Sequence, residues 1–517
     1  MERAAHLVVQ HGGSLSGEHG DGQSRGELLR IMYGDRLVGA FEEMKAIFDP
    51  ENRMNPGKVV HPAKLDANLR LGGDWAPRQK RQLHFAYPED SGSFSKAASR
   101  CVGIGRCRQD THEDGEVMCP SYQVTRAEEH STRGRARLLF EMLDGHGDSP
   151  VSDGWRSEEV KDALDLCLAC KGCKTDCPVN VDMATYKAEF LAQHYRGRLR
   201  PRADYALGWL PSVSRLVERT GTAPLINRAA SVPALRRLAT KAAGLEDRGL
   251  PTFARTTLQR WWSEQSKEPR VGERGTVMLW PDTFTNRFSP EIGRAAVQLL
   301  EDVGWRVVMP QEPVCCGLTW ISTGQLGEAK RRLRRVASVL HDHLDSGGLV
   351  LVLEPSCAAV FRSDATDLLP EELDLRRLRE QTVTLAELLT KHSPGWEPRR
   401  SGQRLSAIAQ VHCHQHAVLG WDADADLLDA AGIDVERLDS GCCGLAGNFG
   451  FTGGHGEVSR AVGEQVLLPR VRERERGVEV LADGFSCRTQ ISEYAPEARP
   501  LHLAQVLARA QIGSTEG

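Results

Sequence analysis

Four cysteines between residues 167 and 178 constrain this chain more than any other stretch. They stand in the run Cys167-Leu-Ala-Cys170-Lys-Gly-Cys173-Lys-Thr-Asp-Cys177-Pro178, with the spacing C-x2-C-x2-C-x3-C-P. Cysteines at this spacing wrap one short loop around a [4Fe–4S] cube, and the last of them binds a second cube where there is one. Zinc sites use two separated pairs of ligands, so a zinc knuckle does not fit this spacing. The run therefore predicts an iron–sulfur site.

The bulk composition is that of a globular protein with reduced thiols. The 517 residues are enough for about three or four domains. A net charge of −4 gives no argument for a nucleic-acid partner. No apolar run reaches the roughly 18 residues of a membrane span, and residues 1–6 contain no apolar signal core. We therefore expect a cytoplasmic protein with no transmembrane segment. Its 14 cysteines should be metal ligands rather than disulfides, because every one of them falls inside a motif.

A second, looser cysteine group precedes the first. Residues 63–95 have the polar composition of a linker, and Cys101, Cys107 and Cys119-Pro120 follow it. Both groups end in Cys-Pro, and each leads into a predicted helix, over 132–143 and over 183–195. We therefore predict a ferredoxin-type domain over 96–200.

In ferredoxins with two clusters, the last cysteine of each group binds the cluster of the other group. This rule assigns the ligands of the two clusters here. One cluster would use Cys167, Cys170, Cys173 and Cys119, and the other would use Cys101, Cys107 and Cys177. The second set is one thiolate short. Three alternatives stay open for it: a cluster with three cysteines, Asp110 or His112 as the fourth ligand, or no cluster.

Residues 201–270 form a basic stretch between the two cysteine-rich regions. They hold 12 Lys and Arg against 6 Asp and Glu, a net charge of +6. One interpretation is a patch that faces a membrane surface or a quinone. The other is a set of connecting helices with solvated arginines, and we favour it because the apolar periodicity is short and interrupted by proline.

The C-terminal half repeats one pattern of strands and helices, over 271–395 and again over 396–510. Such alternation implies a parallel sheet with right-handed crossovers. The fold class is therefore α/β: a helical ferredoxin-type domain followed by two parallel-sheet halves. The predicted strands are 276–280, 306–309, 349–353, 406–411, 435–438 and 478–482, and the predicted helices are 291–303, 325–344, 424–431 and 457–475.

Each copy of the repeat contains an adjacent pair of cysteines followed by glycine, Cys315-Cys316-Gly317 and Cys442-Cys443-Gly444. These and the other cysteines of the repeat lie just past the carboxyl ends of predicted strands, the edge where open α/β sheets bind ligands. Neighbouring cysteines can bind different irons of a shared cluster, and the glycine permits close backbone approach. Buried apolar filler is the alternative for paired cysteines, but the recurrence in both copies argues against it.

The two copies differ in their remaining cysteines. The second copy adds Cys413 and Cys487, which gives it four thiols. The first adds only Cys357, and Pro281-Asp282-Thr283 stands where the second copy has Cys413. We therefore expect a complete set of thiolate ligands only in the second copy. The first-copy cysteines would add ligands or act as thiols.

These motifs resemble known iron–sulfur proteins. The repeat resembles the cysteine-rich CCG domain of the heterodisulfide reductase B subunit, the glycolate oxidase iron–sulfur subunit and the C subunit of anaerobic glycerol-3-phosphate dehydrogenase. The stretch Cys119-Pro-Ser-Tyr followed by His130-Ser-Thr-Arg-Gly-Arg-Ala-Arg137 resembles the iron–sulfur half of flavin–iron–sulfur fusion dehydrogenases. The first resemblance rests on Glu312-Pro-Val-Cys-Cys-Gly317, Glu354-Pro-Ser-Cys357, Cys413-His414, Ser440 to Gly450 and Phe485-Ser-Cys487, and it implies a further cluster in the repeat.

Residues 1–62 contain a glycine-rich loop, Ser16-Gly-Glu18-His19-Gly-Asp-Gly22, an amphipathic stretch over 37–48, and the motif Phe48-Asp-Pro with Asn55-Pro-Gly-Lys58. They resemble the C-terminal end of FAD-linked oxidases of the vanillyl-alcohol-oxidase type, among them D-lactate, glycolate and D-2-hydroxyglutarate dehydrogenases. The resemblance implies that Glu18 binds a divalent metal that grips a 2-hydroxy acid. It implies that His19 takes the hydroxyl proton, a role that suits a neutral imidazole, and that Asn55 contacts the flavin cofactor.

The resulting interpretation is the C-terminal half of an FAD and iron–sulfur dehydrogenase of 2-hydroxy acids. We expect a truncated reading of a longer fusion, and the alternative is a flavin domain on a separate polypeptide. Electrons would pass from FAD through the clusters to a quinone or another acceptor. The rival is a stand-alone electron-transfer subunit without catalysis. A thiol/disulfide reductase ranks last, because no C-x-x-C redox pair stands on a thioredoxin-like unit. The expected location is cytoplasmic, with a peripheral position at the inner face of the membrane as the variant.

Overall fold

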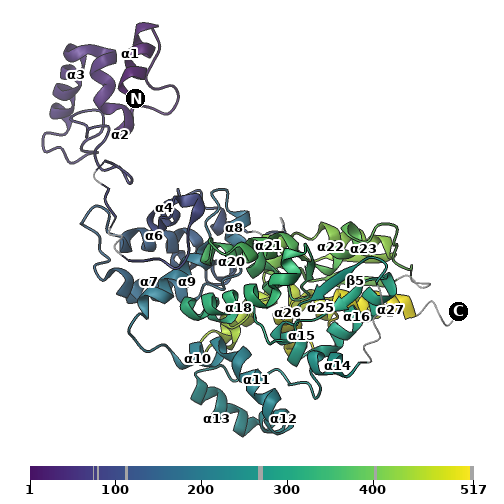
Figure 1. Ribbon diagram of the computed structural model, residues 1–517. Coiled ribbons are helices and arrows are strands. Elements are labelled where there is room, and N and C mark those ends of the chain that lie inside the picture. Colours follow the sequence, from purple (N-terminus) through teal and green to yellow (C-terminus); the bar gives the residue numbers. More distant parts are fainter. Residues whose placement is uncertain (74, 78–80, 111–114, 266–271, 401–404, 513–517) are drawn as a thin grey trace. The chain divides into compact units, whose positions relative to one another are not determined.

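Two units make up the chain (Figure 1). The computed structural model describes residues 1–517 except 74, 78–80, 111–114, 266–271, 401–404 and 513–517. The first unit comprises Met1–Pro77 with Gly145–Asp148, and the second comprises Arg78–Asp144 with Ser149–Gly517. All 14 cysteines therefore belong to the second unit.

The first unit is a small helical body. Its long helix α3 bends at Gly34, whose φ of 72° is left-handed and suits glycine. The helices bury few apolar side chains, among them Ala5, Leu29 and Val38, and they leave Ile47 and Phe48 exposed. The amphipathic stretch predicted over 37–48 is the second half of α3. The helices are α1 Glu2–Gln10, α2 Gly22–Arg25, η1 Gly26–Leu28 and α3 Leu29–Phe48.

The cysteine-rich helical part of the second unit is built on a core of aromatic rings. Phe94 lies against Trp155 with 4.9 Å between ring centroids, and Trp155 stacks on Phe190. Phe85 and Tyr87 are buried in the same core, so this part of the second unit includes residues from the stretch predicted as a linker over 63–95. Both predicted helices are present as α6 and α9. The helices are η2 Pro88–Asp90, α4 Phe94–Ser99, η3 Arg106–Arg108, α5 Pro120–Thr125, η4 Glu128–His130, α6 Thr132–Met142, η5 Gly154–Arg156, α7 Glu158–Asp165, α8 Gly172–Asp176 and α9 Met183–His194.

A connector of short helices follows, and α11 to α13 lie at one end of the second unit, away from the sheets (Figure 1). Its α12 buries no side chain, and α13 buries only Thr240. The connector helices are α10 Arg202–Gly208, α11 Leu210–Thr220, α12 Ala223–Ser231, α13 Pro233–Ala243 and α14 Leu258–Glu264.

The first repeat forms a four-stranded parallel sheet in the order β2-β1-β3-β4, with Val277 opposite Val307 on one side and Leu349 on the other. The final strand β4 has two residues and was not predicted. The elements are β1 Thr276–Leu279, α15 Thr283–Arg287, α16 Pro290–Val303, β2 Arg306–Val308, α17 Leu318–Ser322, α18 Leu326–Asp345, β3 Leu349–Leu351, α19 Pro355–Ala359, η6 Val360–Asp364, α20 Ala365–Leu368, α21 Leu373–Gln381, β4 Thr382–Val383 and α22 Leu385–Lys391.

The second repeat forms a three-stranded parallel sheet in the order β6-β5-β7, with Ala407 opposite Val435 and Glu479. One hydrophobic core that includes Val277, Leu351, Ala407 and Leu503 joins the two sheets. The elements are β5 Leu405–Ala409, η7 Gln415–Leu419, α23 Asp422–Ala430, β6 Ile433–Arg437, η8 Phe449–Phe451, α24 Gly456–Gln465, α25 Leu467–Glu473, β7 Glu479–Leu481, α26 Phe485–Tyr494 and α27 Leu503–Ile512.

One predicted helix is wrong in its extent. The stretch 457–475 is not continuous, because α24 ends at Gln465 and α25 begins at Leu467. Pro469 has no N–H to donate to the preceding turn, so a helix can contain it only within its own first turn. The helix therefore stops and restarts before it. Across the described residues, none of the helices is long and apolar enough to cross a membrane.

Candidate metal centres

One small cavity is lined by the four cysteines that were predicted to share a cluster, Cys119, Cys167, Cys170 and Cys173. Cys119 stands just before α5, and Cys167, Cys170 and Cys173 come from the loop that ends in α8. Ala169 and Lys171 take left-handed φ values of 52° and 61°, which curl this loop around the cavity. Each of the four cysteines is between 7 and 9 % exposed. The cavity is therefore buried and lined by sulfur.

The chemistry of this cavity fits an iron–sulfur cluster. Burial, and then the neighbouring Cys413, Cys173 and Cys167, raise the pKa of the Cys170 thiol well above its usual value. Such a crowded group of thiols ionises only when a cation shares the negative charge. Sulfur also accepts hydrogen bonds here, from Arg135 Nη1 to Cys119 Sγ and from the Met183 N–H to Cys173 Sγ, both at 3.4 Å.

The other predicted ligand group surrounds Cys107. Burial, together with the nearby Cys119, Cys101 and Cys177, raises the pKa of the Cys107 thiol to about 11. The Arg133 N–H donates to Cys107 Sγ at 3.4 Å. Cys119 thus lies between the two groups. Of the proposed fourth ligands, Asp110 is exposed, and His112 lies outside the described residues.

The second-copy cysteines Cys413, Cys442, Cys443 and Cys487 form a linked and buried group. Cys442 shares hydrogen bonds with Cys413 and Cys443, and Cys487 with Cys443. The pKa of the Cys443 thiol falls well below its usual value, because the Cys442 and Cys487 thiols donate to its sulfur. Gly444 has a φ of +89°, and a Cβ there would collide with the carbonyl oxygen of Ser459. Only glycine therefore fits after this pair.

The first-copy cysteines share a cavity with Asp282. Cys316 Sγ lies 3.0 Å from Cys357 Sγ, and Cys315 and Asp282 line the same space. Asp282 Oδ1 accepts hydrogen bonds from the N–H groups of Phe284 and Thr285 at 2.9 Å, which caps α15. Its other oxygen, Oδ2, is buried and has no hydrogen-bond partner among the described residues. A buried oxygen in this state is suited to bind a metal.

No three His, Cys, Asp or Glu side chains of the described residues converge on the position of a single metal ion. An iron–sulfur cluster does not require such convergence, because each thiolate binds a different iron. The cysteine groups fit clusters better than they fit lone ions.

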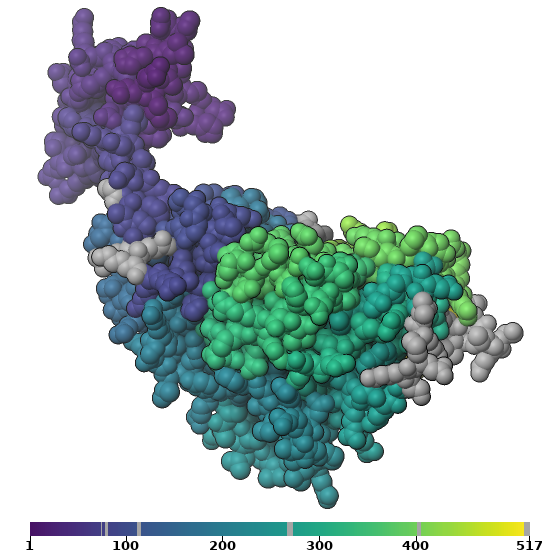
Figure 2. Space-filling view, viewed as in Figure 1, coloured from purple at the N-terminus to yellow at the C-terminus, as the bar shows by residue number. Residues whose placement is uncertain are grey.

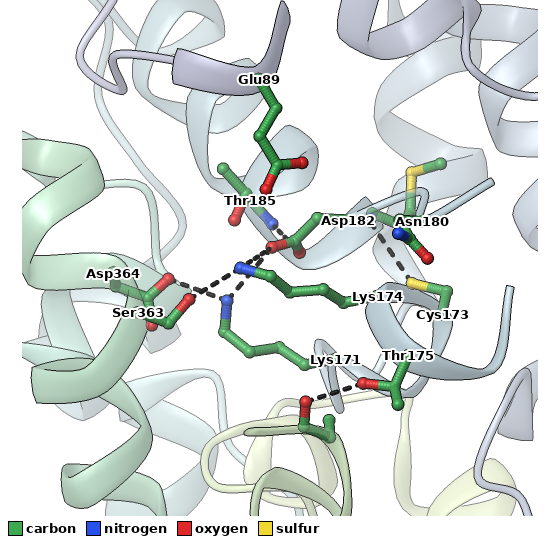
Figure 3. A network of polar contacts seen from close by, with 12 residues as sticks. Glu89, Lys171, Cys173, Lys174, Thr175, Asn180, Asp182, Thr185, Ser363 and Asp364 are labelled. Carbon is green, nitrogen blue, oxygen red and sulfur yellow. Dashed lines mark hydrogen bonds and ion pairs between the residues drawn. The ribbon is translucent and has the colours of Figure 1, made fainter. Parts of the chain in front are cut away.

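We call residues 167–177, the loop with α8, the cluster loop. Hydrogen bonds and ion pairs join it to both repeats, between residues about 190 to 245 positions apart in sequence. Figure 3 shows Lys171 and Lys174 reaching η6, where Lys171 Nζ lies 2.8 Å from Asp364 and Lys174 Nζ lies 2.8 Å from Ser363 Oγ. Thr175 Oγ1 donates to the carbonyl of Ala417 in η7 at 2.7 Å. Both contacted segments are single turns of π-helix. Such turns are rare overall, but they are often found at functional sites.

Asp176 ties the same loop to the segment that ends in Cys119. Its Oδ2 accepts hydrogen bonds from the N–H groups of Val117 and Met118, at 2.8 and 3.0 Å. Its Oδ1 lies 2.7 Å from His416 Nε2 in η7. Sequence reasoning missed Lys171, Asp176, Asp364 and His416, because single charged residues give no spacing signal. The one hint was that Lys171 follows Cys170 and Asp176 precedes Cys177.

The candidate substrate residues of the first unit lie at its surface. Glu18 Oε1 and His19 Nε2 are 3.1 Å apart, and the side chains are 86 % and 80 % exposed. Asn55 is exposed with a left-handed φ of 49°. The loop positions the acid beside the base, as the sequence motif implies, and the roles of these three residues stay predictions.

Comparison with known families matches three parts of the chain. Residues 1–59 match the family described as FAD linked oxidases, C-terminal domain, residues 96–181 match the 4Fe-4S dicluster domain, and residues 282–362 match the cysteine-rich (CCG) domain. The chain thus carries, in order, a segment that matches FAD-linked oxidases, a 4Fe-4S dicluster domain and a cysteine-rich domain. The three parts stand in the order that the motifs predicted, which confirms the resemblances and the fold class.

Curated relatives match most of this chain. The chain is 27% identical to "D-2-hydroxyglutarate dehydrogenase" of Escherichia coli (strain K12), with 94% of the chain and 50% of that protein covered. It is 22% identical to the "Glycolate oxidase iron-sulfur subunit" of the same organism, with 76% of the chain and 89% of that relative covered. The chain spans about half the length of the D-2-hydroxyglutarate dehydrogenases that it matches.

Proposed function

We propose that this chain is the iron–sulfur electron-transfer portion of an FAD-dependent dehydrogenase of 2-hydroxy acids. The observation that supports it best is the contact between the cysteine groups. Cys170 of the cluster loop packs with Cys413 and Cys442 of the second repeat in one apolar group. Iron–sulfur clusters supply one-electron carriers. The protein's part is to hold the cysteine groups side by side and away from water.

The substrate end of the proposal rests on the first unit and on the relatives. D-2-hydroxyglutarate is the first candidate among 2-hydroxy acids, because the relatives that cover nearly all of this chain are named for it. Glu18 would help to hold a divalent metal at the substrate, and His19 would take the hydroxyl proton. Asn55 would contact FAD, which a flavin-binding domain or a separate polypeptide supplies.

The acceptor end of the proposal is a quinone, reached from a peripheral position on a membrane. Leu225 of α12 and Leu238 of α13 are 68% and 69% exposed. Residues 210–243 hold six Lys and Arg and one acid, Glu218. Exposed apolar side chains beside basic ones suit the surface of an anionic bilayer. This arrangement now favours the membrane interpretation of the connector over solvated connecting helices.

A second candidate function is a stand-alone electron-transfer subunit without catalysis of its own. The match to 89% of the glycolate oxidase iron–sulfur subunit favours it. An immunoblot of the source organism separates the two, because a fusion runs at about twice the mass of residues 1–517 and a separate subunit runs at their mass.

The experiment for the main proposal follows electrons from substrate to cysteines. The native protein, purified anaerobically, is mixed with D-2-hydroxyglutarate, and flavin bleaching and the paramagnetic signal of reduced clusters are recorded. We expect both in the parent protein. In the Cys170→Ala variant, flavin should still bleach, while about one cluster's worth of iron and the transfer to an added acceptor are lost. Unchanged iron content in that variant would sink the ligand assignment.

A further inference from the structure

An apolar cavity lies where the cluster loop, the connector and both repeats meet. Its volume is about 280 Å³, just below the roughly 300 to 1,000 Å³ of typical small-molecule sites. Phe284, Phe288 and Phe485 form an aromatic wall, in which Phe284 stacks on Phe485 with 4.5 Å between ring centroids and 17° between planes. Such a wall suits a flat aromatic ring.

The cavity borders the proposed electron carriers on two sides. Cys413 of the second repeat lines it, and so do Leu168 and Lys171 of the loop that holds Cys167, Cys170 and Cys173. A ring inside the cavity would therefore lie beside both cysteine groups. Lys171 Nζ is paired with Asp364 at 2.8 Å, so it is not available to pair with a charged ligand, and the cavity favours an uncharged ligand over an anion.

Two histidines supply the polar atoms. The His414 N–H donates to His412 Nδ1 at 3.1 Å, which leaves His412 Nε2 as the nitrogen that carries hydrogen. His414 Nε2 donates to the carbonyl of Ala169 at 3.1 Å. Its Nδ1 is then an acceptor that is buried and has no hydrogen-bond partner among the described residues. The pair thus offers one donor and one acceptor, as needed to bind a carbonyl and a hydroxyl on one ring.

The connector links this cavity to the exposed apolar surface. Ala206, Leu207 and Leu210 of α10 and α11 line the cavity. Val213 and Leu216, farther along α11, are exposed. The teal connector forms the lower end of the second unit in the space-filling view (Figure 2). A lipid-soluble ligand at a bilayer surface would thus be close to helices that line the cavity.

We propose that this cavity binds the ring of a quinone-class acceptor, a site that deepens the proposed function and rests on it. The quinone takes up two electrons, delivered one at a time by the iron–sulfur carriers of the proposed function. It takes up two protons from solvent and leaves as the quinol. His412 donates to a ring carbonyl, and His414 Nδ1 accepts from the hydroxyl of the reduced ring.

The test fills the cavity without touching a cysteine. Ala206→Phe places a ring in the cavity, and Ala234→Phe makes the same change on exposed α13 as the control. Reconstituted full-length chain is dialysed against menadione, a quinone without a tail. We expect one bound quinone in the parent and in Ala234→Phe, and at least tenfold weaker binding in Ala206→Phe. Leu207→Phe is the second filling variant.

A kinetic experiment distinguishes electron transfer to a quinone bound in the cavity from electron transfer to any oxidant in solution. Dithionite-reduced chain is mixed with menadione or with ferricyanide, and cluster reoxidation is followed by absorbance. The rate with menadione should saturate in the parent and lose its saturable part in Ala206→Phe, while the ferricyanide rate and the iron content stay unchanged. Equal menadione binding in parent and both filling variants would overturn the site. If menadione binds as expected but 2-hydroxy acids never reduce the clusters of the native protein, only the proposed function fails.

Discussion

At the scale of single residues, Lys171 is the most consequential side chain that is not a cysteine. It lies between Cys170 and Cys173, buried against Asp364 and Asp182. Burial alone would lower the pKa of Lys171, but the two carboxylates outweigh burial and hold the pKa above its usual value. The ammonium group is therefore charged at every working pH. A fixed positive charge beside a cluster favours the reduced, more negative state.

Replacing Lys171 should lower the reduction potential of the neighbouring cluster. A unit charge roughly 8–16 Å from the cluster is worth about 1–2 kcal/mol at an effective dielectric constant of about 20, or about 40–90 mV for one electron. A redox titration monitored by electron paramagnetic resonance measures the reduction potential of the cluster in the Lys171→Met variant and in the parent. Lys174→Met is the matched control, because its side chain is more exposed and should give a smaller shift. The double variant Lys171→Met/Asp364→Asn also removes the partner's negative charge. If charge causes the shift, the reduction potential of the double variant should return part of the way to that of the parent.

The asymmetry between the repeats gives a second prediction at this scale. Cys442→Ser removes one of four thiolates and should lose a cluster's worth of iron and the transfer to the final acceptor. Cys315→Ser should lose less iron, because Asp282 stands where a fourth thiolate would be, and a carboxylate binds iron–sulfur clusters less well than a thiolate does. Asp282→Cys should raise the iron content above that of the parent. Equal iron loss in Cys315→Ser and Cys442→Ser would mean that both copies share one site.

The cysteines could be proposed as ligands from spacing alone, whereas their supporting residues could not. C-x2-C-x2-C-x3-C-P and Cys-Cys-Gly define chemistry through residue type and interval. The ion pair of Lys171 with Asp364 joins residues 193 positions apart. Only the packing of the cluster loop on η6 brings them together, and no local pattern records that packing.

At the scale of elements, α11 to α13 give a prediction about membranes. Leu225→Glu/Leu238→Glu should weaken co-sedimentation with phosphatidylglycerol vesicles by roughly tenfold or more, because each buried leucine side chain contributes about 1.5–3 kcal/mol. Binding of the parent should also fall in about 0.5 M salt, which screens the basic residues. Vesicles of pure phosphatidylcholine should bind the parent weakly.

Leu373→Glu is the control for this measurement. Leu373 on α21 is 55% exposed, outside the connector. If Leu373→Glu weakens vesicle binding as much as the connector variant does, the membrane face is not α11 to α13.

The elements of the repeat were predictable because their periodicity is strong. The strands near 276, 306, 349, 406, 435 and 478 all exist, since buried parallel strands are short apolar runs between helices. The two residues of β4 are too few to show any pattern. The π-helical turns η6 and η7 could not be predicted either, because the extra residue of a π-helical turn does not change the hydrophobic spacing in a recognisable way.

At the scale of the whole molecule, the sequence predicted the order of the domains but not how they meet. The cysteine groups meet because α8 docks on one π-helical turn from each repeat, and the resulting junction encloses the apolar cavity. The structure makes the second unit one continuous body, in which the cluster loop, the connector and both sheets share contacts.

The last prediction concerns what residues 1–517 do in isolation. We expect that this chain, purified without a flavin-binding partner, neither retains FAD tightly nor oxidises 2-hydroxy acids, because cofactor chemistry requires a protein that positions the cofactor. The described part of the first unit presents Glu18 and His19 at an exposed surface. The measurement is flavin per chain by absorbance, with dye reduction by D-2-hydroxyglutarate, and the native enzyme from the source organism as the positive control. The chain alone should still accept electrons from dithionite. Stoichiometric flavin that co-purifies with residues 1–517 would contradict this prediction and place the flavin site within the chain itself.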